Sequence, residues 1–168
     1  MRDAIAVLNA GSSSIKFSLF AQAGNDLEMT VRGQVEGLQT APRFVAKSAN
    51  GETLSTHAWA DGKPLGHDAA LEHIVAFLRE KMQGLSLKGI GHRVVHGGMK
   101  YAQPMRMDAA VLQDLQQFVP LAPLHQPHNL TPIRLMLERR PEVPQVACFD
   151  TAFHRAQPEL AQMFALPM

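Results

Sequence analysis

Apolar and polar residues in the first part of the chain follow the periods of β-strands. A short apolar run at residues 4–8 is typical of a buried strand. Residues 15–19 alternate between apolar and polar side chains, which is the period of a half-buried strand. Residues 28–35 show a further strand-like run. The pattern therefore predicts three strands before residue 36.

Two shorter runs that follow predict a hairpin. Residues 44–46 and residues 53–55 flank Asn50 and Gly51, and Asn-Gly is the dipeptide most typical of a tight turn between two strands. Together with the three runs before them, they predict five strands in sequential, mostly antiparallel order.

After residue 67 the apolar residues recur every three or four positions, which predicts helices. The first predicted helix has Asp68 as its N-cap and Gly84 as its stop. The second has Asp108 as its cap, and the third ends before Pro141. The apolar residues at helical spacing are Leu71, Ile74, Val75, Leu78 and Met82; Val111, Leu112, Leu115 and Phe118; and Leu130, Ile133 and Leu137.

Two more strand-like runs alternate with these helices. Residues 90–95 end in two glycines, and residues 143–149 form an apolar run typical of a buried, parallel strand. A meander followed by alternating strands and helices predicts a mixed α/β fold. We expect a five-stranded mixed sheet with flanking helices, in the order five strands, helix, strand, two helices, strand and helix.

The composition is that of an ordinary globular protein. Of the 168 residues, 46% are hydrophobic and 18% are charged, and the net charge of +1 gives no reason to expect nucleic acid or an anionic membrane as a partner. Cys148 is the single cysteine, so an intramolecular disulfide is excluded and a reducing compartment fits. The sequence shows no signal peptide and no apolar run long enough for a membrane span, so we expect a cytoplasmic protein.

The first candidate for chemistry is the segment of residues 9–16, between two predicted strands. Gly11 permits a positive φ angle or a close approach to the backbone. The three serines that follow supply hydroxyl and backbone N–H groups, and Lys16 adds a positive charge, a combination that suits phosphate oxygens. The glycine–lysine spacing is not that of a Walker A loop. These residues alone leave a phosphate-binding turn and a polar hairpin equally open.

The second candidate is the segment of residues 91–98. Arg93, at the end of a strand and followed by two glycines, could bind a carboxylate or a phosphate through two parallel hydrogen bonds. His92 and His96 lie four residues apart, a spacing that places two zinc ligands together on a helix. The valines between them predict a strand instead. Structural histidines with satisfied hydrogen bonds are therefore the favoured interpretation.

The third candidate is His125, in a loop that prolines hold stiff. A histidine presented with little freedom could donate a hydrogen bond to a phosphoryl group in transfer. The alternative is the approach to a helix that is capped near His128 or Asn129. That alternative explains the prolines but gives no role to the histidine.

The fourth candidate is Asp150, which directly follows the last predicted strand. Ligand sites in such sheets gather at the carboxyl ends of strands. An aspartate there can hold a Mg²⁺-bound water, position a nucleophile or exchange a proton. The alternative is a helix N-cap at Asp150 or Thr151. The position after a buried strand favours a functional role.

These four segments, in this order, resemble the acetate kinase family. Residues 9–16 and residues 91–98 look like two of its signatures, and the segments that end at His125 and run from Phe149 to His154 also match. The resemblance extends through nearly the whole chain. It implies the ribonuclease H-like, actin-like fold of the sugar-kinase-like ATPases, in which two related domains close over a nucleotide. Residues 1–168 would form the N-terminal domain.

The resemblance implies a reversible reaction in which ATP phosphorylates acetate, giving acetyl phosphate and ADP. It implies Mg²⁺ or Mn²⁺ as the metal, no membrane or nucleic acid as a partner, and a homodimer of the full-length enzyme. The implied roles are metal binding by Asn9, contact with the ATP phosphates by Lys16, Ser12 and Ser14, catalysis by Arg93, His125 and Asp150, and substrate binding by Arg93, Val95 and Leu124. Carboxylic acids are ionised at neutral pH and need no general base. We therefore hypothesise that Asp150 mainly orients Mg²⁺ or its waters.

The sequence departs from the family pattern at two places beside the candidate histidine. Gln126 and His128 stand where asparagine and a small residue or proline are usual, and both could adjust the hydrogen bonds of His125. Members of the family also continue beyond the position of Met168. Their second half carries another histidine, another arginine, a metal-binding glutamate and most of the adenosine pocket. The 168 residues alone are therefore expected to bind ATP weakly and to show no appreciable turnover.

Three alternatives remain open from the sequence. A propionate or butyrate kinase would share the site and have a larger pocket for the acyl chain. A non-catalytic ATP-binding module of the same fold would have no need of Arg93 or His125. A metal-binding protein could use several of the eight histidines.

Overall fold

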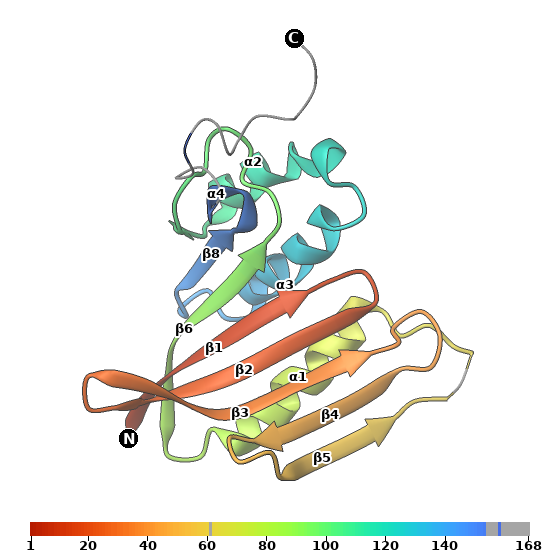
Figure 1. Cartoon of the computed structure of the whole chain (residues 1–168), viewed down its shortest axis with the longest axis vertical. Coiled ribbons are helices and arrows are strands. Elements are labelled where there is room, and N and C mark those ends of the chain that lie inside the picture. The colour runs from red at the N-terminus through yellow and green to blue at the C-terminus, as the bar shows by residue number, and fades with distance from the viewer. Residues whose placement is uncertain (61, 154–157, 159–168) are drawn as a thin grey trace.

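The computed structural model describes residues 1–60, residues 62–153 and residue 158 (Figure 1). The described residues form one mixed sheet of eight strands, in the order β5-β4-β3-β2-β1-β6-β8-β7. The strands are β1 (Arg2–Ala10), β2 (Ser14–Ala23), β3 (Asp26–Glu36), β4 (Arg43–Ser48), β5 (Thr53–Ala58), β6 (Leu85–Val94), β7 (Met105–Arg106) and β8 (Gln145–Phe149). The mixed α/β fold is confirmed, whereas the predicted number of five strands in the sheet is wrong.

The first five strands form the antiparallel meander that the sequence predicts. The hairpin between β4 and β5 turns at Asn50 and Gly51, and Gly51 has a φ angle of +86°, a conformation that glycine adopts without strain. The meander makes up more than half of the sheet. The predicted order contained seven strands, and the structure joins all of these and the short β7 in one sheet.

The second part of the chain adds β6, β8 and β7 to the other edge of the meander. β6 pairs in parallel with β1 and with β8, as expected for a buried strand that follows a helix. β6 begins at Leu85 rather than at residue 90. The predicted strand was too short because Ser86 and Lys88 interrupt the apolar run at its start. β7 has only two residues, too few to produce a pattern, and pairs with β8.

The helices follow the predicted order, with two corrected starts. The helices are α1 (His67–Lys81), α2 (Ala109–Gln116), the 3-10 turn η1 (Val119–Leu121), α3 (Gln126–Arg139) and α4 (Asp150–Phe153). Asp108 caps α2 as predicted, because its Oδ1 accepts a hydrogen bond from the Val111 N–H at 2.8 Å. The N-cap of α1 is Gly66 and not Asp68, which lies in the first turn. α3 begins at Gln126, so neither His128 nor Asn129 caps it.

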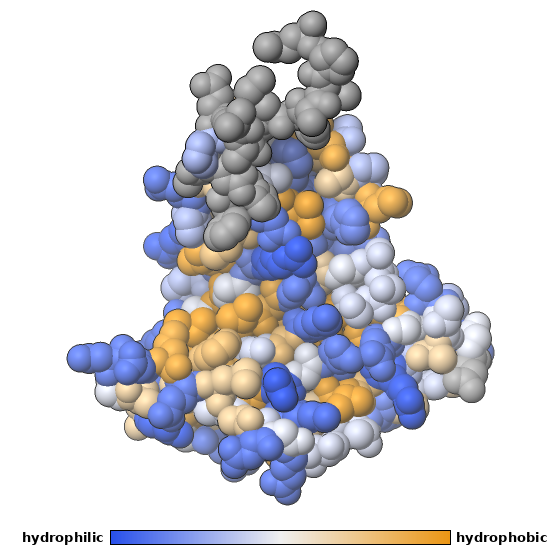
Figure 2. Space-filling view, viewed as in Figure 1, coloured by the Kyte–Doolittle hydropathy of each residue, from blue (hydrophilic) through white to orange (hydrophobic). Residues whose placement is uncertain are grey.

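The helices α1 and α3 cover one face of the sheet (Figure 1). The apolar side chains behind that face form two clusters, and their largest members include Phe17, Phe44, Ile74 and Phe77 in the first and Leu115, Ile133 and Phe149 in the second. The sheet face that α1 leaves uncovered shows hydrophobic residues among polar ones (Figure 2). Within the part of the chain that the structure describes, no helix is both long and apolar enough to cross a membrane.

His92 is a buried residue of a strand, as predicted, but within the described part of the chain its Nδ1 has no hydrogen-bond partner, so the predicted satisfied hydrogen bonding holds only for Nε2. It lies on β6 with 2% of its surface exposed, and its Nε2 lies 2.7 Å from the Gln145 Oε1. The Nδ1 of His96 accepts a hydrogen bond from the Gly98 N–H at 2.8 Å. Among the residues that the structure describes, no group of three or more metal-ligating side chains could hold an ion, which gives no support to the zinc interpretation.

The buried His92 predicts a loss of stability in acid. Burial lowers the pKa of His92 to about 4, and the hydrogen bond with Gln145 opposes this shift. The unfolded chain takes up the proton near pH 6.5, so the contribution of His92 to stability is present above pH 6.5 and is lost as the pH falls towards 4. We expect His92 to account for a decrease of about 3 kcal/mol in the free energy of unfolding.

Urea denaturation at pH 7 and at pH 4 measures this contribution. The matched control is the double variant His92→Leu/Gln145→Leu, which removes the titrating ring together with its partner. The pH-dependent loss should be smaller in the double variant by roughly the same 3 kcal/mol. Equal losses in the two proteins would contradict the assignment.

Candidate phosphoryl-transfer site

Four of the candidate side chains meet at one edge of the sheet. Asn9 lies near the end of β1, Arg93 near the end of β6, Asp150 directly after β8, and His125 directly before α3. The three strands run in parallel and therefore end at the same edge. A cavity of about 280 Å³ opens there, lined by Asn9, Ala10, Gly11, Arg93, Val95, His125, Asn129 and Asp150.

Arg93 and Asp150, which both line this cavity, form a bidentate ion pair. The Arg93 Nε donates to both carboxylate oxygens of Asp150 at 2.9 and 3.0 Å, and Nη2 donates to Oδ2 at 2.6 Å. These hydrogen bonds raise the pKa of the Arg93 guanidinium above its usual range, and the nearby negative charge acts in the same direction. Arg93 is therefore held in a fixed orientation and carries its charge at any physiological pH.

The guanidinium of Arg93 retains donors for a further anion. Its Nη1 donates to the Asn9 Oδ1 at 3.4 Å. A guanidinium has five N–H groups, so Nη1 and Nη2 each keep one N–H group beyond the bonds to Asn9 and Asp150. The Arg93 side chain is 53% exposed. The arrangement can therefore bind a carboxylate or a phosphoryl oxygen without breaking the ion pair.

The turn after Asn9 forms a second wall of the cavity. It closes through a hydrogen bond from the Gly11 N–H to the Ser14 carbonyl oxygen at 2.8 Å. Gly11 does not have a positive φ angle, and a Cβ atom there would meet the Ser14 carbonyl oxygen at an ordinary 3.6 Å. The backbone conformation therefore does not require glycine at this position. Gly11 lines the cavity, and the absence of a side chain leaves its backbone accessible there.

Histidines from α1 and α3 support this turn from behind. The Nε2 of His67 lies 2.7 Å from the Gly11 carbonyl oxygen, and the ring of His128 stacks on His67 at 4.5 Å. Burial lowers the pKa of His128, and the neighbouring His67 and His125 lower it further. A neutral ring is therefore favoured at His128, and it packs on His67 without adding charge.

His125 is exposed directly before α3, and it is one of the residues that line the cavity. It occupies the N-cap position, but its side chain makes no capping hydrogen bond. Gln126, which we expected to adjust His125, is fully buried and bonds the backbone of His96 instead, donating to its carbonyl oxygen at 2.9 Å and accepting from its N–H at 3.3 Å. This departure from the family pattern therefore acts on the loop after β6.

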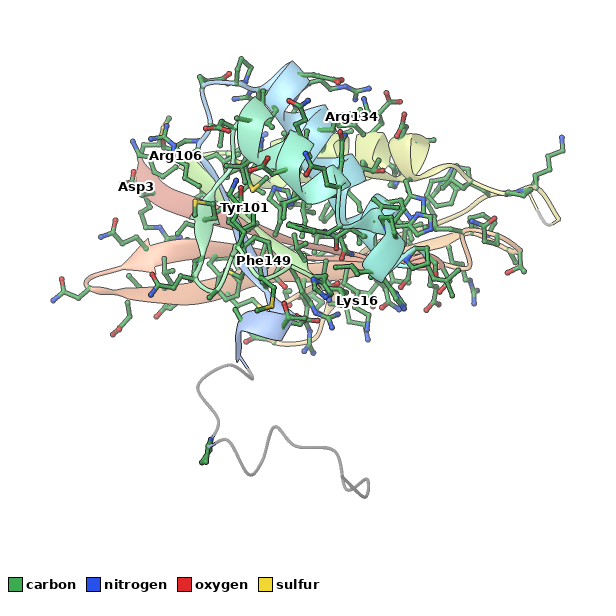
Figure 3. All side chains as sticks on the ribbon, turned by 90° about the horizontal axis from the view of Figure 1, so that it is seen from above. Asp3, Lys16, Tyr101, Arg106, Arg134 and Phe149 are labelled. Atoms are coloured by element: carbon green, nitrogen blue, oxygen red, sulfur yellow. The ribbon has the colours of Figure 1, made fainter. Side chains whose placement is uncertain are left out.

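Four candidate residues do not line the cavity. Ser12 and Ser14 belong to the turn but are not among the residues that line the cavity, and Leu124 is 72% exposed. Lys16 pairs with Asn9 across β1 and β2, and lines a shallow depression of about 560 Å³ together with Arg32 and Lys47 of the neighbouring strands. Figure 3 shows Lys16 at the end of the sheet opposite to Asp3.

The cavity also contains a residue that the sequence interpretation missed. Asn129 is 4% exposed and bonds the backbone at the ends of both β1 and β6. Helical spacing could have revealed it, because Asn129 lies four residues before the buried Ile133 and therefore on the apolar face of α3. A buried amide on such a face requires hydrogen-bond partners.

The oxygen atoms in the cavity suit Mg²⁺ only as part of a larger set. Asn9 offers an amide oxygen and Asp150 a carboxylate, whereas Mg²⁺ requires six oxygen ligands and commonly takes several from water and substrate phosphates. Both Asp150 oxygens accept hydrogen bonds from Arg93, whose charge opposes direct contact with a cation. The two residues therefore fit a metal that is held mainly by phosphate oxygens and water.

Comparison with known proteins identifies a family that matches nearly the whole chain. The model described as "Acetokinase family" matches residues 4–168. The acetate kinase of Rhizobium meliloti is 47% identical over 165 residues, which cover 98% of this chain and 42% of that protein. The acetate kinase of Streptomyces coelicolor is 41% identical over 167 residues, covering 96% of this chain and 40% of that protein. The chain thus spans about two fifths of the length of these relatives.

Solved structures show the same fold. A propionate kinase from Francisella tularensis superposes with a TM-score of 0.79 at 34% identity, over 98% of this chain and 41% of that structure. The acetate kinase of Porphyromonas gingivalis gives a TM-score of 0.79 at 31% identity, over 99% of this chain and 42% of that structure. The predicted actin-like ATPase fold is confirmed by these matches.

Proposed function

The chain belongs to the acetokinase family, and on that premise we propose that it forms the N-terminal, acceptor-binding half of a kinase that transfers a phosphoryl group between ATP and acetate. The observation that carries the proposal is the Arg93–Asp150 pair in a cavity of about 280 Å³. A cavity of this size with one oriented guanidinium suits a small carboxylate. Charge and shape at the site thus agree with the family.

In the proposed reaction, one carboxylate oxygen of acetate attacks the γ-phosphorus of ATP as the bond to the ADP oxygen breaks. Phosphoryl transfer depends on positioning and on neutralising charge more than on covalent help from the protein. Arg93 binds the acceptor carboxylate or an equatorial phosphoryl oxygen, and His125 donates a hydrogen bond to the group in transfer. Mg²⁺, when bound, would neutralise charge on the phosphates, and Asn9 and Asp150 are the residues that would hold it through water.

In the proposed division of the active site, this chain supplies the acceptor-binding part and the remainder of the enzyme supplies the rest. We expect the isolated 168 residues to bind ATP weakly and to form no acyl phosphate above the level of a heat-denatured sample. A chimera in which this chain replaces the matching 42% of the Rhizobium meliloti acetate kinase should form acetyl phosphate. Trapping of the acyl phosphate with hydroxylamine measures both. Robust turnover by the isolated chain would overturn this division.

A second candidate acceptor is propionate, since one structural match is a propionate kinase. One methylene group in an apolar pocket is worth about 1–3 kcal/mol, or roughly 10–200-fold in kcat/KM. The chimera should prefer acetate to propionate and butyrate by a factor in this range. A preference for propionate would assign the alternative function. Nucleotide binding with no phosphorylation of any of the three acids would favour a non-catalytic module.

A further inference from the structure

Asn129 connects the two strands that present Asn9 and Arg93. Its Oδ1 accepts a hydrogen bond from the Val95 N–H at 2.9 Å, and its Nδ2 donates to the Ala10 carbonyl oxygen. The side chain is 4% exposed, so water does not compete for these bonds. Ala10 directly follows Asn9, and Val95 lies two residues beyond Arg93. Asn129 therefore acts on the backbone beside both site residues.

The position of Asn129 continues the pairing of the sheet. The regular register between β1 and β6 ends at the pair Leu8 and His92, and the ends of the strands beyond it have no further backbone ladder. A primary amide carries the same N–H and carbonyl groups as a peptide unit. Asn129 therefore replaces the next rung, at the point where the strand ends separate to form the cavity.

The end of β8 is tied to the same point. The carbonyl oxygen of Val95 accepts a hydrogen bond from the Thr151 N–H at 3.4 Å, and the Thr151 hydroxyl accepts one from the Gly97 N–H at 3.3 Å. Thr151 directly follows Asp150. Val95 is thus held by Asn129 on one side and by Thr151 on the other. The backbone ends that carry Asn9, Arg93 and Asp150 form one connected unit, and Asn129 joins the backbone at the end of β1 to it through a buried side chain.

We propose that Asn129 is a positioning residue that sets the separation of Asn9 and Arg93 and thereby the width of the acceptor cavity. The inference rests on the proposed carboxylate kinase function, because the cavity is the site where that reaction would occur. Without the amide, the ends of β1 and β6 can move apart. A displacement of about 1 Å in a reacting geometry lowers turnover by about 10²-fold.

The variant Asn129→Leu in the active chimera tests the proposal. It removes both hydrogen bonds and keeps the branching at Cγ and the number of heavy atoms in the side chain. We expect kcat for acetate phosphorylation to fall by about 10²-fold and KM for acetate to rise, while KM for ATP changes by less than about threefold. The control is Gln145→Leu, a buried amide of the core that bonds His92 and does not line the cavity. It should lower the thermal midpoint and leave kcat unchanged.

The variant Asn129→Asp adds a readout that a merely structural role would not change. An ionised aspartate keeps the acceptor for the Val95 N–H but places an oxygen against the Ala10 carbonyl oxygen. A protonated aspartate restores the donor. The kcat of Asn129→Asp relative to that of the parent chimera should therefore rise as the pH falls through the pKa of the introduced carboxyl, measured at pH values where the variant remains folded.

The possible outcomes test the positioning role of Asn129 separately from the proposed carboxylate kinase function. A parent chimera that folds but phosphorylates no carboxylate refutes the proposed function. An active parent whose Asn129→Leu form keeps kcat within about threefold refutes the positioning role. Loss of activity equal to that of Gln145→Leu at matched thermal stability refutes it as well. If Asn129→Leu does not fold, the pH dependence of Asn129→Asp decides, and a flat ratio overturns the proposal.

Discussion

The substitution Arg93→Ala should lower kcat for acetyl phosphate formation by about 10³-fold in the chimera with the Rhizobium meliloti enzyme. Arg93 is the one guanidinium among the residues that line the described cavity, and Asp150 orients it through bonds of 2.6–3.0 Å. Its removal deletes the charge that binds the acceptor and leaves Asp150 with an unpaired negative charge beside incoming phosphate. Both effects oppose the same step.

Two matched variants separate position from charge. Arg93→Lys keeps the positive charge but cannot form the paired bonds to Asp150, so it should recover only part of the activity. Arg106→Ala removes an arginine from β7, which Figure 3 shows on the side of Asp3 and away from Lys16. This control should leave kcat unchanged. Equal losses in Arg93→Ala and Arg106→Ala would show that net charge, rather than the site, is responsible.

The substitution Asp150→Asn should lower kcat by about 10²-fold and raise the Mg²⁺ concentration needed for half-maximal activity. Asparagine retains the shape of the side chain but replaces one carboxylate oxygen with an N–H₂ group, which cannot accept from Arg93. The variant therefore releases Arg93 and weakens the attraction for metal-bound water. The KM for acetate should rise in parallel, because the freed guanidinium no longer holds one orientation.

The pH dependence of this variant distinguishes positioning from proton transfer. Acetate has a pKa near 5 and is ionised at pH 7, so its attack requires no base. The shape of the pH–rate profile should therefore be the same for Asp150 and Asp150→Asn, while the Mg²⁺ and acetate dependences change. A changed pH profile with unchanged Mg²⁺ and acetate dependences would return a proton-transfer role to Asp150. Glu138→Gln, at an exposed ion pair with Arg134, serves as the charge-matched control.

The local patterns of the chain were sufficient for most of the fold. The meander, the Asn50–Gly51 turn and the cap at Asp108 each depend on residues close together in sequence, and each is present in the structure. The number of strands could not be predicted from local patterns. β7 is too short to show a period, and its place at the edge of the sheet depends on pairing with β8, whose first residue, 145, lies 40 positions after the first residue of β7, 105.

The candidate site likewise contains features that are local in sequence, which could be predicted, and features that join distant residues, which could not. Arg93, His125 and Asp150 could be singled out from the sequence, because each lies at or beside the end of a strand or helix. The ion pair between Arg93 and Asp150 links residues 57 positions apart and had no local signal. The predicted helix began after Asn129, so the buried face of α3 was not extended back to it. The role of Leu124 stays a prediction, since this residue lies next to His125 in sequence but is exposed and does not line the described cavity.

The central claim is that the cavity around Arg93 is the acceptor site of a carboxylate kinase. The most direct test is the rate of ATP-dependent acetyl phosphate formation by the chimera, measured by hydroxylamine trapping with and without Arg93→Ala. We expect turnover within about tenfold of the Rhizobium meliloti parent for the chimera and a loss of about 10³-fold for its Arg93→Ala form. A folded, ATP-binding chimera that forms no acyl phosphate, or one whose rate is unchanged by Arg93→Ala, would contradict it.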